Sequence, residues 1–196
     1  DAPEPRPLRA DEMSAGLTRI TTTVEQLRAF AEDGTVEGSV APVDLNSEVE
    51  RLVELIQGAA EGKLTIHTDL VPVPHVGVPV RGLRQILLSL LRPSICRSEG
   101  AREVWLRTRW QQGEVVLELV EPSRTLNQED LGRLFDPFYE PGNAGQPGSL
   151  ELSAAYGLAR SMGASLRATS PPEEGLCIQL VISASELVKP GQEKLA

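Results

Sequence analysis

Residues 83–96 read LRQILLSLLRPSIC, an apolar run with the length and spacing of a helix in the protein core. Near its end stands Pro93, which has no backbone N–H and whose ring clashes with the carbonyl group of the residue one turn earlier. We therefore expect Pro93 to bend or end the helix. Two interpretations stay open on this stretch alone: Pro93 terminates an ordinary core helix, or it replaces a residue that did chemistry.

Strand patterns flank this helix on both sides. Residues 63–70 (KLTIHTDL) alternate in polarity, which predicts a half-buried strand with Leu64, Ile66, Thr68 and Leu70 pointing inward. Alternating runs at 102–110 and 114–121, separated by glutamine and glycine, predict a β-hairpin. Downstream, the patterns predict helices at 127–134 and 149–163 and strands at 165–170 and 175–183. This order of elements predicts an α+β fold with helices on one face of a mixed sheet.

Two amphipathic helices are predicted before these elements. In residues 43–62 the apolar side chains line one face, and Ser47 and Glu50 have the spacing of a capping box. Residues 10–33 carry the heptad spacing of a helix that packs against another helix. A lone amphipathic helix lying on its own domain would show the same stripe and stays open as an alternative. The residues expected to form a dimer contact are Met13, Leu17, Ile20, Val24 and Leu27.

Charge and cysteine content limit the partners of the chain. Its 196 residues include 28 acidic and 19 basic side chains, for a formal net charge of -9. This charge repels phosphate backbones and anionic membrane surfaces, so we expect no nucleic acid and no membrane contact. Cys96 and Cys177 lie among apolar residues far apart in sequence, which predicts buried thiols in the cytoplasm. His67 and His75 lack partners at metal-ligand spacing and are expected at the surface.

Three segments, read in order, resemble the successive boxes of the sensor histidine-kinase ATP-binding domain. They are residues 83–95, 118–140 and 148–183, and the most specific pieces are LFDPF at 134–138 and LSAAYG at 152–157. The resemblance implies an α/β sandwich of the Bergerat type, preceded by the second helix of a dimerisation hairpin. It divides the chain into a linker (1–9), the helix with its linker (10–41), the sandwich (42–184) and a polar tail (185–196). Because the chain opens without methionine, we expect it to be a fragment of a longer protein.

The same resemblance implies a nucleotide site whose residues here depart from the family pattern. The two asparagine positions of the family, one of which holds Mg²⁺, fall at Ser89 and Pro93. Proline has no side-chain oxygen to offer a hard cation. The adenine-binding aspartate corresponds to Glu121, and the two glycines that follow it in the family correspond to Ser123 and Thr125. These side chains occupy space that glycine leaves to the ligand.

The second glycine box of the family corresponds to residues 147–151. Such loops cradle phosphates with backbone amides at a helix N-terminus. Here Pro147, Ser149 and Glu151 stand at the glycine positions of the box, Gly148 lies between the first two, and Pro147 lacks an amide hydrogen. Glu151 also places a negative charge near the expected phosphates. An interpretation of residues 142–149 as an ordinary surface loop stays open.

With these departures, the resemblance implies a regulatory module that has lost nucleotide chemistry. It would have no catalytic residue, metal or cofactor, and would act as a homodimer on a response-regulator receiver domain or another kinase. One alternative is a divergent histidine autokinase that uses ATP and Mg²⁺. Another is a histidine phosphotransfer protein, which requires a phosphoacceptor histidine upstream of Asp1. Arg124 and Arg133 are candidates for binding an acidic partner, although isolated arginines are usually solvated.

Overall fold

The computed structural model describes residues 41–59, 64–96, 102–139, 141, 150–183 and 187–188. The expected helix at 10–33, with its dimer residues Met13, Leu17, Ile20, Val24 and Leu27, lies outside these residues. So do Gly148 and Ser149 of the second glycine box and the side chain of Cys96. These expectations stay predictions.

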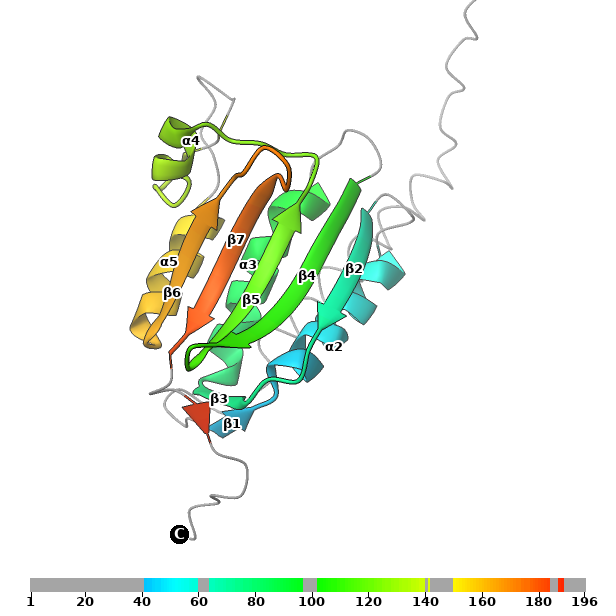
Figure 1. Ribbon diagram of the computed structural model, residues 1–196, viewed down its shortest axis with the longest axis vertical. Coiled ribbons are helices and arrows are strands. Elements are labelled where there is room, and N and C mark those ends of the chain that lie inside the picture. The colour runs from blue at the N-terminus through cyan, green and yellow to red at the C-terminus, as the bar shows by residue number, and fades with distance from the viewer. Residues whose placement is uncertain are drawn as a thin grey trace, which may run out of the picture.

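A five-stranded sheet forms the centre of the fold (Figure 1). Its strand order is β2-β4-β5-β7-β6, in which β2 and β4 run parallel and the other neighbours run antiparallel. The strands are β2 (Leu64–Leu70), β4 (Arg102–Gln111), β5 (Glu114–Glu121), β6 (Ala164–Thr169) and β7 (Leu176–Ile182). The predicted mixed sheet is therefore confirmed.

Three helices cover one face of this sheet: α2 (Leu45–Ala59), α3 (Val80–Cys96) and α5 (Glu151–Ser161) (Figure 1). The core lies between the two layers and includes Leu52, Ile86, Leu91, Leu117 and Leu180, each 3% exposed or less. The short helix α4 (Gln128–Arg133) lies beyond one end of the sheet, and Asn127 caps it by accepting a hydrogen bond from the Asp130 amide. The α+β arrangement expected from the sequence is confirmed.

The opposite face of the sheet also carries apolar side chains. Val116, Val120, Cys177 and Val181 are buried there, although they are separate from the core under the helices. Burial raises the pKa of the Cys177 thiol to about 11, so this cysteine is protonated at neutral pH. The expected burial is confirmed for Cys177, which is 5% exposed.

A second, three-stranded sheet was not predicted. It consists of β1 (Ala41–Val43), β3 (His75–Val78) and β8 (Leu187–Val188), with β3 in the middle and both pairings antiparallel. His75 begins a strand and does not lie in a loop. Leu187 and Val188 also pair, although the sequence interpretation assigned residues 185–196 to a polar tail. Strands this short leave too few alternating residues to give a strand signal, and prolines lie within β1 and on either side of β3.

Three local expectations were wrong. Helix α3 continues to Cys96, so Pro93 does not end it. Helix α2 starts with a cap from Asp44, whose Oδ1 accepts the amides of Asn46 and Ser47 at 3.0 and 3.3 Å, whereas the Ser47 hydroxyl donates to Asp44 Oδ2. The Asp44 carboxylate, three residues before the predicted cap Ser47, caps the helix because it reaches the first free amides. Thr68 is exposed, although Leu70, two residues further along the strand, packs against the core.

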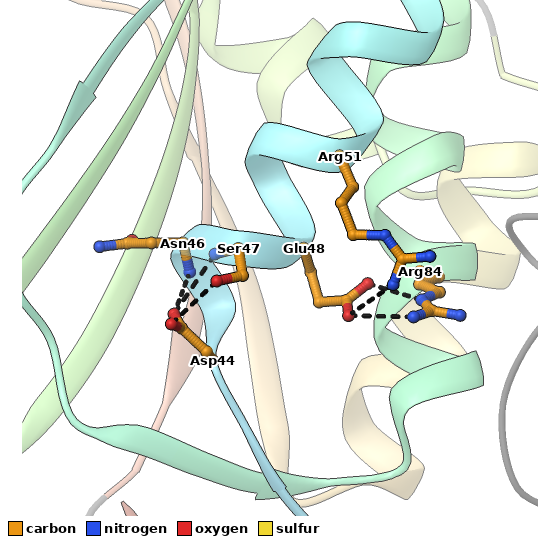
Figure 2. A network of polar contacts seen from close by, with 6 residues as sticks. All are labelled: Asp44, Asn46, Ser47, Glu48, Arg51 and Arg84. Carbon is orange, nitrogen blue, oxygen red and sulfur yellow. Dashed lines mark hydrogen bonds and ion pairs between the residues drawn. The ribbon is translucent and has the colours of Figure 1, made fainter.

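A buried ion pair joins α2 to α3 (Figure 2). Arg84 Nε and Nη2 lie 2.6 and 3.0 Å from the two carboxylate oxygens of Glu48, and the residues are 4% and 8% exposed. Arg51, one turn further along α2, places its Nη1 at 3.6 Å from Glu48 Oε1. The paired geometry, with two parallel N–H···O contacts, is the strongest form of this interaction. It fixes the register of α2 on α3.

We predict that Arg84→Met destabilises the protein strongly, because it leaves the Glu48 carboxylate buried beside a single distant guanidinium. The expected loss in the free energy of unfolding is about 3 kcal/mol, at the lower end for a broken buried pair because Arg51 remains. Urea unfolding measures it. Arg109→Met, which breaks an exposed pair with Asp69, is the matched control and should cost far less. Equal losses in the two variants would contradict the structural role of the buried pair.

Candidate functional site

The candidate site lies where the end of β5 meets the last turns of α3. Glu121, the final residue of β5, is 6% exposed, and Ser94 of α3 is 2% exposed. The Ser94 hydroxyl donates a hydrogen bond to Glu121 Oε1. Arg124 places Nη1 at 3.6 Å from the other carboxylate oxygen of Glu121. The Glu121 carboxylate, which is expected to bind the adenine base, thus has Ser94 and Arg124 as protein partners.

The backbone around Glu121 is held by the turn between β6 and β7. Gly175 has a φ of 80°, and a Cβ built on it would lie 2.3 Å from the Glu121 carbonyl oxygen. Only glycine permits that approach. The Arg124 amide donates to the same carbonyl oxygen at 3.1 Å, and the Leu126 amide donates to Ser170 Oγ at 2.8 Å. The first bond closes the turn after β5, and the second ties this segment to the β6–β7 turn.

A second ion pair crosses from α3 to α5. Arg92 Nη1 lies 2.5 Å from Oε1 of Glu151, the first residue of α5, and the side chains are 63% and 23% exposed. Glu151 stands at a position where the family pattern has glycine, and Arg92 precedes Pro93, which stands at the expected metal-ligand position. The two side chains therefore meet on the side of the site expected to face the phosphates.

The other predicted site residues lie around these pairs. Ser89 and Pro93 on α3 are half-buried, whereas Ser123 and Thr125 after β5 are exposed. The structure brings Glu121 and Glu151 each to a partner, and neither Ser94 nor Arg92 was predicted from the sequence. Both residues flank Pro93 in sequence, and this adjacency was the signal that could have placed them near the site.

Arg124 and Arg133 were considered as binders of an acidic partner. Arg124 is largely buried against Glu121. The Arg133 guanidinium lies 4.2 Å from the centre of the Tyr139 ring and 3.7 Å from Asp136. Both arginines thus make contacts within the protein.

The segment after α4 packs against α5 through aromatic rings. The rings of Phe135 and Tyr156 stack with centroids 5.2 Å apart. Tyr139 donates a hydrogen bond to Asp130, which raises the pKa of Tyr139 above its ordinary value. Phe138 is 57% exposed and has a φ of 60°, an uncommon backbone conformation for a residue with a Cβ. The rest of the segment is therefore tied down while Phe138 projects.

Neither histidine shows a metal-binding arrangement. His67 is half-buried and stacks on Trp105 at 4.4 Å, with Nε2 3.8 Å from Glu103, whereas His75 is exposed. Across the described part of the chain, no three His, Cys, Asp or Glu side chains gather as a metal site. Within the same residues, no helix is long and apolar enough to cross a membrane.

Comparisons with known proteins agree on the type of fold. The sequence profile of the family described as histidine kinase-, DNA gyrase B- and HSP90-like ATPase matches residues 79–186, which is more than half of the chain. The sensor protein TorS of Escherichia coli (strain K12) is 29% identical over 169 residues, covering 84% of this chain. The chain spans 18% of the length of that relative.

Two solved structures support the same fold at low identity. The mycobacterial sensor histidine kinase MprB superposes with a TM-score of 0.61 and 19% identity, over 74% of this chain and 97% of that one. The nucleotide-free catalytic domain of histidine kinase ThkA gives a TM-score of 0.64 and 13% identity, over 75% and 98%. The α+β sandwich with a mixed five-stranded sheet is thus of the Bergerat ATP-binding type.

We predict opposite effects for alanine at two glycines. Gly175→Ala should lower the free energy of unfolding by at least about 1–2 kcal/mol, the cost of a left-handed conformation for a residue with a Cβ, and should also displace Glu121. Gly157→Ala lies on α5 with no atom within 4 Å of the added Cβ, and it should raise the free energy of unfolding by about 0.5–1 kcal/mol. Thermal unfolding of both variants measures this. A neutral Gly175→Ala would refute the close approach.

Proposed function

The chain belongs to the family of histidine kinase-, DNA gyrase B- and HSP90-like ATPases, and we propose that it is the ATP-binding-type domain of a sensor histidine kinase in two-component signalling. The similarity to TorS, a sensor protein, and the fold shared with two histidine kinases support this. Because the chain spans 18% of TorS, the activity and partners of the whole protein are part of the proposal.

We further propose that nucleotide chemistry has been lost and that the domain acts through protein contacts. The observation that carries this proposal is the pairing of the site's own charges. Glu121 is bound to Ser94 and Arg124, and Glu151 is bound to Arg92. An adenine amino group would have to compete for the first carboxylate, and a triphosphate would meet the second. Pro93 offers no oxygen to a magnesium ion that would offset the phosphate charge.

A divergent histidine autokinase is the second candidate, and the comparisons by themselves favour it. The matched family is one of ATPases, and the relatives are named as kinases or sensors. In that case Glu121 would receive the adenine, and the residues around Ser89 would have to bind Mg²⁺ and phosphates without the asparagine.

The proposed partners follow from the proposed role in two-component signalling. Residues 10–33 would form a homodimer, and a response-regulator receiver domain or another kinase would be the protein contacted. A cytoplasmic location belongs to this proposal. The phosphotransfer alternative adds a phosphoacceptor histidine on a preceding helix, which the sequence upstream of Asp1 would reveal.

We predict no measurable binding of ATP or ADP to the wild-type protein at millimolar concentration, with or without Mg²⁺. This corresponds to a binding free energy weaker than about 4 kcal/mol. Titration calorimetry measures it, and thermal unfolding with Mg-ATP gives a second readout, since any ligand selective for the folded state raises the melting temperature. Micromolar binding would overturn the proposed loss of nucleotide binding and favour the autokinase candidate.

A restored variant provides the positive counterpart. Pro93→Asn with Ser123→Gly, Ser149→Gly and Glu151→Gly rebuilds the family pattern at four positions, and we expect its nucleotide affinity to rise above that of the wild type. The matched control retains Pro93 and carries the three glycine changes alone, which separates metal coordination from the space that glycine opens. If both variants unfold more easily and neither gains affinity, the pocket is not a disabled nucleotide site.

We predict a homodimer through the stripe at 10–33, because burying each large apolar side chain is worth roughly 1.5–3 kcal/mol. Ile20→Glu with Leu27→Glu should produce a monomer by light scattering at micromolar concentration. Thr22→Glu with Gln26→Glu is the matched control, since it adds the same charge off the stripe and should leave the dimer intact. A monomeric wild type would assign the stripe to a contact within the chain.

A further inference from the structure

The contact between Arg92 and Glu151 joins the last turns of α3 to the start of α5. Arg92 lies within the last two turns of α3, and Glu151 is the first residue of α5. Arg92 Nη1 and Glu151 Oε1 are 2.5 Å apart, so the two charged groups are in direct contact. Glu151 is mostly covered, at 23% exposure, so its carboxylate faces the protein more than the solvent.

The placement of Glu151 matches the dipole of α5, because a helix N-terminus carries a partial positive charge and favours an anion. Glu151 therefore supplies at α5 the negative charge that a bound phosphate supplies at other helix N-termini. Arg92 supplies, beside Pro93, a positive charge where the proline cannot hold a metal ion.

We propose that Arg92 and Glu151 are an internal substitute for a metal and a phosphate, and that this pair closes the phosphate side of the site to polyanions. The inference rests on the proposed function, because it explains how the site is held when no nucleotide binds. Glu121 gives independent support on the base side of the site. There too the carboxylate is paired with protein side chains, Ser94 and Arg124.

The Arg92–Glu151 pair determines which ligands the phosphate side of the site admits, because it sets the charge that an incoming ligand meets. A triphosphate or pyrophosphate approaching α5 must displace the Glu151 carboxylate from Arg92 and then lie beside it. Removing the Glu151 carboxylate alone should make the phosphate side of the site attractive to an anion. The α5 N-terminus and the Arg92 guanidinium would then both present positive charge to an anion.

The first experiment measures the pair without any ligand. Melting temperatures of wild type, Arg92→Gln, Glu151→Gln and the double variant form a cycle, in which we expect each single change to lower the melting temperature by about 1–4 °C and the double change to lower it by less than their sum. Raising the salt to 1 M should shrink this coupling, since the charges are partly exposed. Additive effects would overturn the proposed contact.

The second experiment uses inorganic pyrophosphate without metal as the probe. Millimolar pyrophosphate should leave the melting temperature of wild type unchanged and raise that of Glu151→Gln by about 2–4 °C. The rise should disappear in Arg92→Gln with Glu151→Gln. Glu54→Gln, on the exposed face of α2, is the matched control for removing one negative charge and should not respond.

Two results would overturn the closed phosphate side: an equal response of wild type and Glu151→Gln, or no response of Glu151→Gln. These outcomes are separate from failure of the proposed function. Binding of Mg-ATP by the wild type would contradict the loss of nucleotide chemistry. The melting-temperature cycle without ligand measures the Arg92–Glu151 coupling whether or not the wild type binds Mg-ATP.

Discussion

The helix layer depends on one buried ion pair, Glu48 with Arg84. Taking both charges out of water is costly, and the cost is offset only when the geometry is good and each partner stays in place. The two contacts at 2.6 and 3.0 Å meet that condition and allow a single register of α2 on α3. Because the core side chains of α3 then pack against the sheet, the same register positions the far end of α3, where Arg92 and Ser94 lie.

Helix α3 therefore divides into a structural half and a half that carries the site. Its first turns hold Arg84, and its last turns hold Ser89, Arg92, Pro93 and Ser94. Pro93 has no amide hydrogen to donate to the Ser89 carbonyl, yet the helix continues for three more residues. The packing of α3 against the sheet thus tolerates proline at this position.

The main sheet, the helices and the family were predictable from the sequence, because alternation and helical spacing are local properties. The hairpin at 102–121 and the capped helix at 128–133 are examples. The contacts of the site were not predictable, since Ser94 reaches Glu121 across 27 residues and no pattern marks which side chains will meet. The small sheet was not predicted because its strands have only two to four residues, too few to show alternation. Thr68 breaks the alternation of its strand, although Leu70 beyond it packs against the core.

The small sheet has a mechanical consequence. Strands β1 and β8 pair with the two edges of β3, so the segments that precede and follow the domain both attach through this one sheet (Figure 1). Tension on either segment loads the hydrogen bonds of β3 before it reaches the five-stranded sheet. Two residues of β8 pair with β3, compared with three of β1, so the C-terminal attachment is the weaker one. Under load, Leu187 and Val188 would detach first and leave the sandwich folded.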